Sequence, residues 1–337
     1  MRTHKRTLSV VISAACMAFS ASAMSANWKM AIGDAAGGTQ YELGKTFAAE
    51  MDKRTNGKVN IDLFPNGQLG SEQDTINNAS MGILDLSILA INNITPFSPT
   101  VGVMTLPYVI QGPEDAKLLT QGEVGKQMTE NTLRDAGVRI LGWAYSGCRR
   151  LSNSAKPVAS PSDLNGLVIR VPKNEIMIAS YQAWGVNPSP LAWSETFTAL
   201  QQGVVDGQDN PYITIDAMKF YEVQKYITES CYVFSLEPLI MGEGAFQSLN
   251  EDMQATVLEA GKAATEHSYD YLLASEEGIK KRLVEEHGMT IVQPANDEKE
   301  WIEQATAIWP RFYDSIGGKD KLDNVLNVLG REPAPAK

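Results

Sequence analysis

Two arginines stand at positions where a protein could hold an anion. Arg170 ends the apolar run LVIRVP at residues 167–172, and open α/β sheets place their ligands at such strand ends. Arg149 follows another apolar run, within GCRR at residues 147–150. A guanidinium group is a planar fork that pairs with a carboxylate through two parallel hydrogen bonds. The spacing is consistent with carboxylate binding, although a structural ion pair at Arg170 is an equal alternative.

A third polar stretch, GVVDGQDNP at residues 203–211, includes Asn210. Its side chains could hydrogen-bond to the polar edge of a small molecule, which such sites need besides an anchor for charge. An ordinary turn after a strand explains the same residues.

Motifs for catalysis and for metal binding are not found in the sequence. The three histidines make no plausible triad with a serine or cysteine, and there is neither a Gly-x-Ser-x-Gly elbow nor a Walker loop. Glu72 and Asp74 could form a glycosidase pair, but two acids on one helical turn are usually a solvated face. Three cysteines and three histidines are too few for a zinc ribbon or an iron–sulfur site. We therefore expect a protein without catalytic activity, cofactor or metal.

Alternating strands and helices are predicted to position these side chains. Strands are expected at residues 28–32, 59–64, 83–89, 138–145, 167–169 and 204–208. Helices are expected between the turn at 37–39 and the stop signal at 55–58, and at residues 72–81, 174–184 and 194–202. The alternation is typical of βαβ units and predicts an α/β protein, and 337 residues suffice for about two domains.

A long helix is predicted near the C-terminus, at residues 250–287. Asn250 is a good N-cap, and Gly261 and Gly278 are the only helix breakers that follow. At 1.5 Å per residue this helix would be about 55 Å long and could bridge two domains. Two ordinary helices that meet near Gly278 are the alternative.

The N-terminus is typical of a secretion signal. Basic residues at positions 2, 5 and 6 precede an apolar run at 8–19, and small residues follow. We expect residues 1–26 to be a signal peptide, cleaved after residue 23 or 26, and the protein to be periplasmic. A buried N-terminal helix is the alternative.

The overall charge argues against a nucleic-acid partner. With 29 basic and 40 acidic residues the formal net charge is −11, whereas nucleic-acid binders carry a basic patch. No later segment has the 18 apolar residues that a membrane span requires.

Longer motifs resemble a known family. The chain contains FPNGQLG at 64–70, LPY at 106–108, LNGLVIRVP at 164–172, TALQQGVVDGQDNP at 198–211 and KFYEVQK at 219–225. Through them the mature chain resembles the solute-binding proteins of tripartite ATP-independent periplasmic (TRAP) transporters, of DctP type. The resemblance implies an α/β periplasmic binding protein fold with two lobes, crossing hinge strands and a long C-terminal helix that bridges the lobes. Such proteins close around a ligand and deliver it to the small and large subunits of a membrane permease.

The resemblance also implies a set of ligand-binding residues. Arg170 would form a bidentate salt bridge with the ligand carboxylate, Arg149 a second contact, and Asn210 a hydrogen bond. Trp193 would line the pocket, with a core aromatic as the alternative. Four residues of the opposite lobe would contact the distal end of the ligand: Asp34, Glu72, Gln73 and Asn93. For Asn93 and its neighbour Asn92 a loop role is an equal alternative.

Arg150 and Cys148, the residues on either side of Arg149, lead to two further predictions. Arg150 is expected to point away from the ligand, because neighbours along a strand alternate. Cys148 and Cys231 are the only thiols of the mature chain, and the family places both stretches on strands that cross between the lobes. Export favours a disulfide between them, with two buried free cysteines as the alternative.

The expected organisation and function follow from the resemblance. Lobe I would comprise 27–146 and 235–274, lobe II 147–234 and 275–325, and 326–337 would be a tail. We expect a monomer that captures a small organic acid. Because Glu72 and Gln73 add no positive charge, a hydroxylated monocarboxylate such as a sugar acid is favoured. A secreted enzyme acting on a small acid and a periplasmic ligand-sensing protein are the alternatives.

Overall fold

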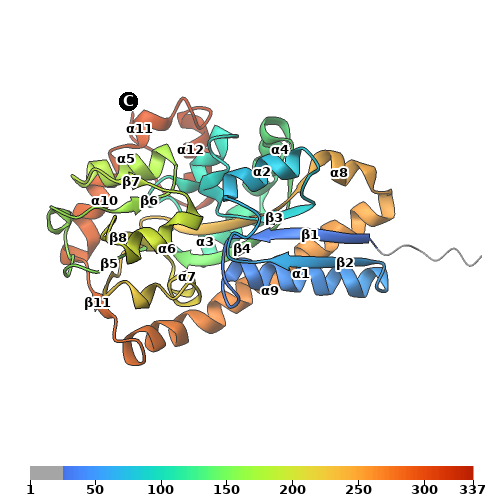
Figure 1. Ribbon diagram of the computed structural model, residues 1–337. Helices are drawn as coiled ribbons and strands as arrows, with labels where there is room; N and C mark the ends of the chain where they lie inside the picture. Colours follow the sequence, from blue (N-terminus) through green and yellow to red (C-terminus); the bar gives the residue numbers. More distant parts are fainter. Residues whose placement is uncertain (1–25, 337) are drawn as a thin grey trace, which may run out of the picture.

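The computed structural model describes residues 26–336, so the expected signal peptide lies almost wholly outside the described residues (Figure 1). The described chain forms two α/β lobes, and the long helix α9 runs along both of them. Within the described residues, no helix combines the length and the apolar character that crossing a bilayer requires.

The first lobe is built on a five-stranded sheet with the order β2-β1-β3-β10-β4. Its strands are β1 (Ala26–Ile32), β2 (Val59–Phe64), β3 (Leu86–Ile88), β4 (Val138–Cys148) and β10 (Phe234–Gly242). The helices α1 (Thr39–Thr55) and α2 (Glu72–Ser80) connect the first three strands, which run parallel, as the βαβ pattern predicts. Strand β10 returns antiparallel to β3 and β4.

Both faces of this sheet are covered by apolar side chains. Met30, Leu43 and Phe47 are fully buried in the core shared by β1, α1 and α9. On the other face, α2 packs with segments that the sequence analysis did not anticipate. These are α3 (Pro113–Gln121), α4 (Glu123–Ala136) and the 3-10 helices η1 (Ile91–Asn93) and η2 (Pro99–Thr105).

The second lobe contains a four-stranded sheet and a short parallel pair. The sheet order is β11 (Thr290–Val292), β9 (Tyr226–Thr228), β5 (Arg150–Asn153) and β8 (Gly207–Asn210), and the pair is β6 (Arg170–Val171) with β7 (Ser189–Pro190). The helices of this lobe are α5 (Glu175–Ala183), α6 (Trp193–Gln201), α7 (Tyr212–Ala217) and α10 (Lys299–Thr306). Strands β6 and β8 begin about three residues later than predicted, because the preceding apolar residues form loops.

Helix α9 (Glu251–Glu285) is one continuous helix of 35 residues, so the alternative of two helices is wrong. It covers the edge strand β4, and its hydroxyl groups complete hydrogen bonds of that strand. The backbone N–H of Trp143 donates to Thr265 Oγ1 at 2.9 Å, and that of Tyr145 donates to Ser268 Oγ at 3.1 Å. An exposed edge with unpaired backbone groups is thereby avoided.

The chain crosses between the lobes where β4 leads into β5 and where β9 leads towards β10. A disulfide joins Cys148 and Cys231 at these crossings, with 4.9 Å between the Cα atoms, as predicted. Arg150 faces away from the site, also as predicted. Its guanidinium binds Glu229 and Glu276, each at 3.1 Å, and lies over the ring of Tyr212.

The chain ends against the first lobe. After α8 (Glu243–Ser248) and α9, the later helices include α11 (Trp309–Phe312) and α12 (Lys319–Val328), and α12 packs on α3 and η2. The expected tail at 326–337 thus begins inside α12. It is anchored further by an ion pair from Arg331 to Asp115 and by a hydrogen bond from Tyr313 to the carbonyl of Pro335.

Candidate functional site

Arg170 opens strand β6 and is only 2% exposed. Its Nη2 and Nε donate to the Leu191 carbonyl at 2.8 and 3.2 Å, and no carboxylate of residues 26–336 lies within ion-pair distance. Burial and the nearby charge of Arg149 lower the pKa of Arg170 to about 10, so it remains charged at neutral pH. Since a buried charge is costly without a partner, this guanidinium is prepared to receive an anion.

Arg149, between β4 and β5, already has a counter-ion. Its Nε donates to Asp209 Oδ1 at 2.8 Å, and Asp209 also accepts hydrogen bonds from the hydroxyls of Tyr181 and Tyr232. Burial opposes the charged form, but the Asp209 carboxylate holds the pKa of Arg149 above its ordinary value. Asp209 therefore fixes and neutralises Arg149. The sequence analysis did not select Asp209, although it directly precedes Asn210 in the same motif.

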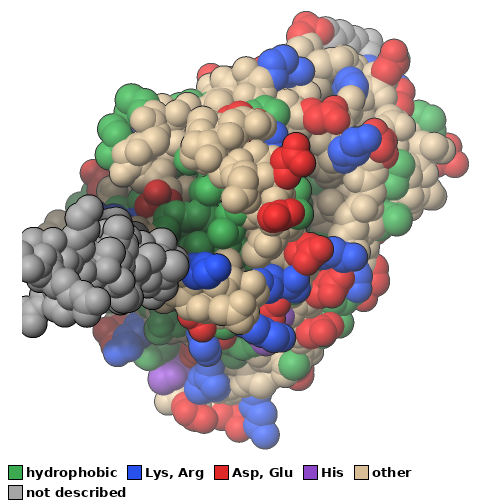
Figure 2. All heavy atoms as spheres, turned by 90° about the vertical axis from the view of Figure 1, so that its right-hand side faces the viewer, with side chains coloured by type: hydrophobic (Ala, Val, Ile, Leu, Met, Phe, Trp, Pro, Cys, Tyr) green, Lys and Arg blue, Asp and Glu red, His purple; other side chains and the backbone are tan. Residues whose placement is uncertain are grey.

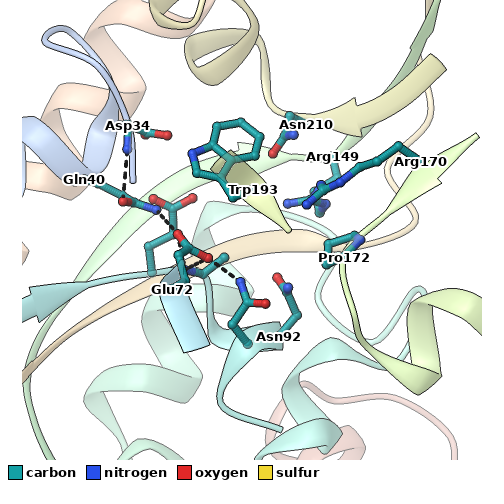
Figure 3. A pocket seen from close by; sticks show the side chains of 12 residues that line it. Asp34, Gln40, Glu72, Asn92, Arg149, Arg170, Pro172, Trp193 and Asn210 are labelled. Atoms are coloured by element: carbon teal, nitrogen blue, oxygen red, sulfur yellow. Dashed lines mark hydrogen bonds between the residues drawn. The ribbon is translucent and has the colours of Figure 1, made fainter. Parts of the chain in front are cut away.

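Arg149 and Arg170 line one side of a cavity, and acidic groups line the other (Figure 3). Asn210 at the end of β8 also lines it, and donates to Gln208 Oε1 at 2.5 Å. Trp193, the first residue of α6, lies between the two sides. Its indole N–H donates to the Gly33 carbonyl of the first lobe at 3.0 Å, so it contacts both lobes.

The first lobe contributes the opposite wall. Of the residues expected there, Asp34, Glu72 and Asn93 line the cavity. Glu72 begins α2 and accepts hydrogen bonds from Gln40 Nε2 at 3.1 Å, from the backbone N–H of Ala90 at 3.3 Å and from Asn93. Burial raises the pKa of Glu72. Asp74 is exposed and caps α2 with Ser71, which removes the basis for a glycosidase pair.

Gln73 is not brought into this cavity. It is half-buried beside it, and its Nε2 approaches the Lys173 carbonyl at 3.4 Å. Successive residues of a helix point about 100° apart, so only Glu72 points inward.

Further lining residues are Asn92 and three residues that the sequence analysis did not select: Gln40, Pro172 and Glu237. For Asn92 the sequence analysis leaves ligand contact and a loop role as equal alternatives, and the structure places it in the lining. Glu237 lies in β10, and burial together with the charge of Glu72 raises its pKa to about 7. A single acidic residue within the apolar strand FSLEPLIMG is the signal that could have identified Glu237.

The two lobes are in contact around the cavity. Its free volume is about 20 Å³, and Asn174 Nδ2 of the second lobe donates to the Asn92 carbonyl of the first at 2.9 Å. An organic acid cannot enter so small a space unless the lobes separate. The structure therefore has the geometry of a closed clamp.

Comparison with known proteins assigns the family. The sequence profile of bacterial extracellular solute-binding protein family 7, the TRAP solute-binding family, matches residues 31–315. The chain belongs to this family. One relative, a solute-binding protein of Roseobacter denitrificans, is 34% identical over 73% of this chain and 75% of its own length. The members of this family are periplasmic solute-binding proteins and not enzymes.

Two solved structures are similar to this family 7 protein. A TRAP periplasmic solute-binding protein of Rhodobacter sphaeroides in an apo open, partially disordered form is 36% identical, with a TM-score of 0.73 over 90% of this chain and 98% of that one. A sugar acid binding protein of Advenella mimigardefordensis in complex with galactonate is 26% identical, with a TM-score of 0.86 over 90% and 97%.

Proposed function

We propose that the protein is the periplasmic component of a TRAP transporter that captures a small organic acid and delivers it to the membrane permease. The observation that carries this proposal is Arg170, a buried cation that faces a cavity and has no carboxylate partner among residues 26–336. A ligand carboxylate would supply the missing charge through two parallel hydrogen bonds. Arg149 and Asn210 would contact the same carboxylate from the second lobe.

A hydroxylated monocarboxylate, such as a sugar acid, is the ligand class that we propose. Only Arg149 and Arg170 bring positive charge to the cavity among its described lining residues, and Asp209 neutralises the first. A second carboxylate at the distal end would therefore find no cation, whereas hydroxyl groups would find acceptors. The galactonate complex of the relative from Advenella supports this choice.

Closure of the two lobes would accompany binding. We propose lobe I as 27–146 with 235–274 and lobe II as 147–234 with 275–325, hinged at the crossing strands. In support, this chain has a higher TM-score with the galactonate complex than with the apo open relative, although its identity to the latter is greater. Only a ligand with more contacts in the closed form can shift the population towards it.

The proposal also covers the cellular location of the protein, its oligomeric state and the absence of a nucleic-acid partner. An N-terminal signal peptide would direct the protein to the periplasm, where it would act as a monomer. Figure 2 shows acidic and basic side chains intermixed over one face of the molecule. We also propose no nucleic-acid partner, because the formal net charge of −11 disfavours one.

A thermal-shift screen over an organic-acid library tests this function. A ligand that binds only the folded state raises the melting temperature, by an amount that grows with its concentration. We expect sugar acids to raise it and to remain chemically unchanged after prolonged incubation. No shift with any acid, or turnover of the acid that binds, would contradict the proposal.

A further inference from the structure

Three buried carboxyl groups form the cavity wall opposite Arg170. Asp34 follows β1, Glu72 begins α2 and Glu237 lies in β10, so three separate elements bring them to the cavity. Figure 3 shows Asp34 and Glu72 on the side away from Arg170. Their exposed fractions are 2%, 8% and 3%. Buried acidic residues are rare in proteins unless they are paired with a cation.

Two of these carboxyl groups retain an unused acceptor. Asp34 Oδ2 and Glu237 Oε2 are buried and have no hydrogen-bond partner in the described part of the chain. The amides of the lining leave both unsatisfied: Gln40 and Asn93 donate to Glu72, and Asn92 Nδ2, itself without a partner in the described part of the chain, donates to neither oxygen. Buried polar atoms without a partner are uncommon in folded proteins, so these two oxygens are free to accept hydrogen bonds from a donor on the ligand.

The charges of the site are also unbalanced. Arg149 is neutralised by Asp209, and Arg170 is left for the carboxylate of the ligand. No further arginine, lysine or histidine lines the cavity among the described residues. A hydroxyl group would offer the acidic wall one hydrogen bond and no charge. A protonated amine offers three N–H donors and a positive charge.

We propose that the ligand is an amino-substituted acid, whose carboxylate binds Arg170 and whose protonated nitrogen lies among Asp34, Glu72 and Glu237. This inference rests on the proposed function, because it takes the binding of the carboxylate to Arg170 as given. It narrows the hydroxylated monocarboxylate proposed above to acids that carry a protonated amine at the distal end, with hydroxyl groups between the two ends.

The raised pKa values of the carboxyl groups in this wall make it possible to distinguish a bound amine from a bound hydroxyl group. Burial and mutual repulsion raise the pKa of Asp34 and of Glu237, in the latter case to about 7. The other charged groups that face this wall are Glu72, Arg149 and Arg170. A cationic ligand end favours the ionised carboxylates, so its binding releases protons and tightens as the pH rises from 6 to 8. A neutral hydroxyl end has no such effect.

Isothermal titration calorimetry of matched acids tests the inference. The probes are 4-aminobutyrate against 4-hydroxybutyrate, 5-aminovalerate against 5-hydroxyvalerate, and 6-amino-6-deoxy-D-gluconate against D-gluconate, with EDTA present at pH 6 and pH 8. We expect the amino member of at least one pair to bind at least about tenfold more tightly, because charge-assisted hydrogen bonds are roughly twice as strong as neutral ones. Buffers of different ionisation enthalpy should report proton release.

A variant of Glu237 tests whether the preference for the amino member arises at the acidic wall. Glu237→Gln keeps the shape but removes the charge, and should cut the preference for the amino member while affecting its hydroxy partner much less. Glu259→Gln, which removes an exposed acid paired with Arg54, should leave both affinities unchanged.

Equal or stronger binding of the hydroxy member in every pair would overturn the inference and leave the proposed function standing. Binding of other organic acids but of none of the amino acids would do the same. Failure of every acid to bind would instead count against the proposed function.

Discussion

On the proposed function, capture of a carboxylate depends first on the Arg170 guanidinium, whose only hydrogen-bond partner within the described residues is the Leu191 carbonyl. Replacement by alanine leaves a bound carboxylate buried and unpaired, which costs on the order of 2–5 kcal/mol. Arg170→Ala should thus weaken binding about 30-fold or more while the fold persists, as calorimetry and circular dichroism would show.

Two further variants make this prediction specific. Arg170→Lys should restore little affinity, because an ammonium group lacks the planar fork. Arg54→Ala removes an arginine paired with Glu50 and Glu259 on the surface and should not change the affinity. Unchanged affinity of Arg170→Ala would exclude this residue from the site.

The buried acids of the wall predict how stability depends on pH. The pKa of Glu237 rises to about 7 on folding, and that of Asp34 also rises, so the folded state binds more protons than the unfolded state. Without ligand, the contribution of these carboxyl groups to the free energy of unfolding is fully present below their ordinary pKa. It is lost as the pH rises through about 7. Urea unfolding should show a lower free energy of unfolding at pH 8 than at pH 5, and Glu237→Gln should reduce the difference. A rise in stability over this range would contradict the burial of neutral carboxyl groups here.

At the level of single elements, two glycines of α9 have opposite roles. A Cβ atom on Gly261 would lie 2.0 Å from the Leu141 carbonyl oxygen, whereas one on Gly278 would have no neighbour within 4 Å. Gly261→Ala should push α9 away from β4 and destabilise the protein by roughly 1–3 kcal/mol, the usual cost of overpacking. Gly278→Ala should stabilise it by about 1 kcal/mol, because alanine favours the helix. Equal effects of the two substitutions in thermal unfolding would contradict this packing.

The sequence allowed most of these elements to be predicted, because apolar periodicity and capping residues are local signals. Asn250 marks the start of α9, and its side chain does accept a hydrogen bond from the backbone N–H of Met253. The site was less predictable, because contacts between distant segments create it. Arg149 and Asp209 are 60 residues apart, and nothing in either local sequence indicates that they pair. Glu237 enters the cavity only because β10 inserts between β3 and β4.

At the level of the whole molecule, the cavity and its lobe contacts predict a clamp motion. The hydrogen bonds from Trp193 to Gly33 and from Asn174 to Asn92 link the lobes in this structure, and we expect them to break when the lobes separate. The hinge would lie at the crossing strands, since a few residues can absorb the rotation. Small-angle scattering should give a smaller radius of gyration with ligand than without, and Arg170→Ala should remove the difference at ligand concentrations that saturate the wild type. Identical profiles would indicate a rigid, preformed pocket.

A crystal structure with the acid that gives the largest thermal shift tests the central claim most directly. We predict closed lobes around the ligand, with its carboxylate oxygens within hydrogen-bond distance of two nitrogens of Arg170 and its distal end against Asp34, Glu72 and Glu237. A ligand bound elsewhere, or a carboxylate that makes no contact with Arg170, would contradict it.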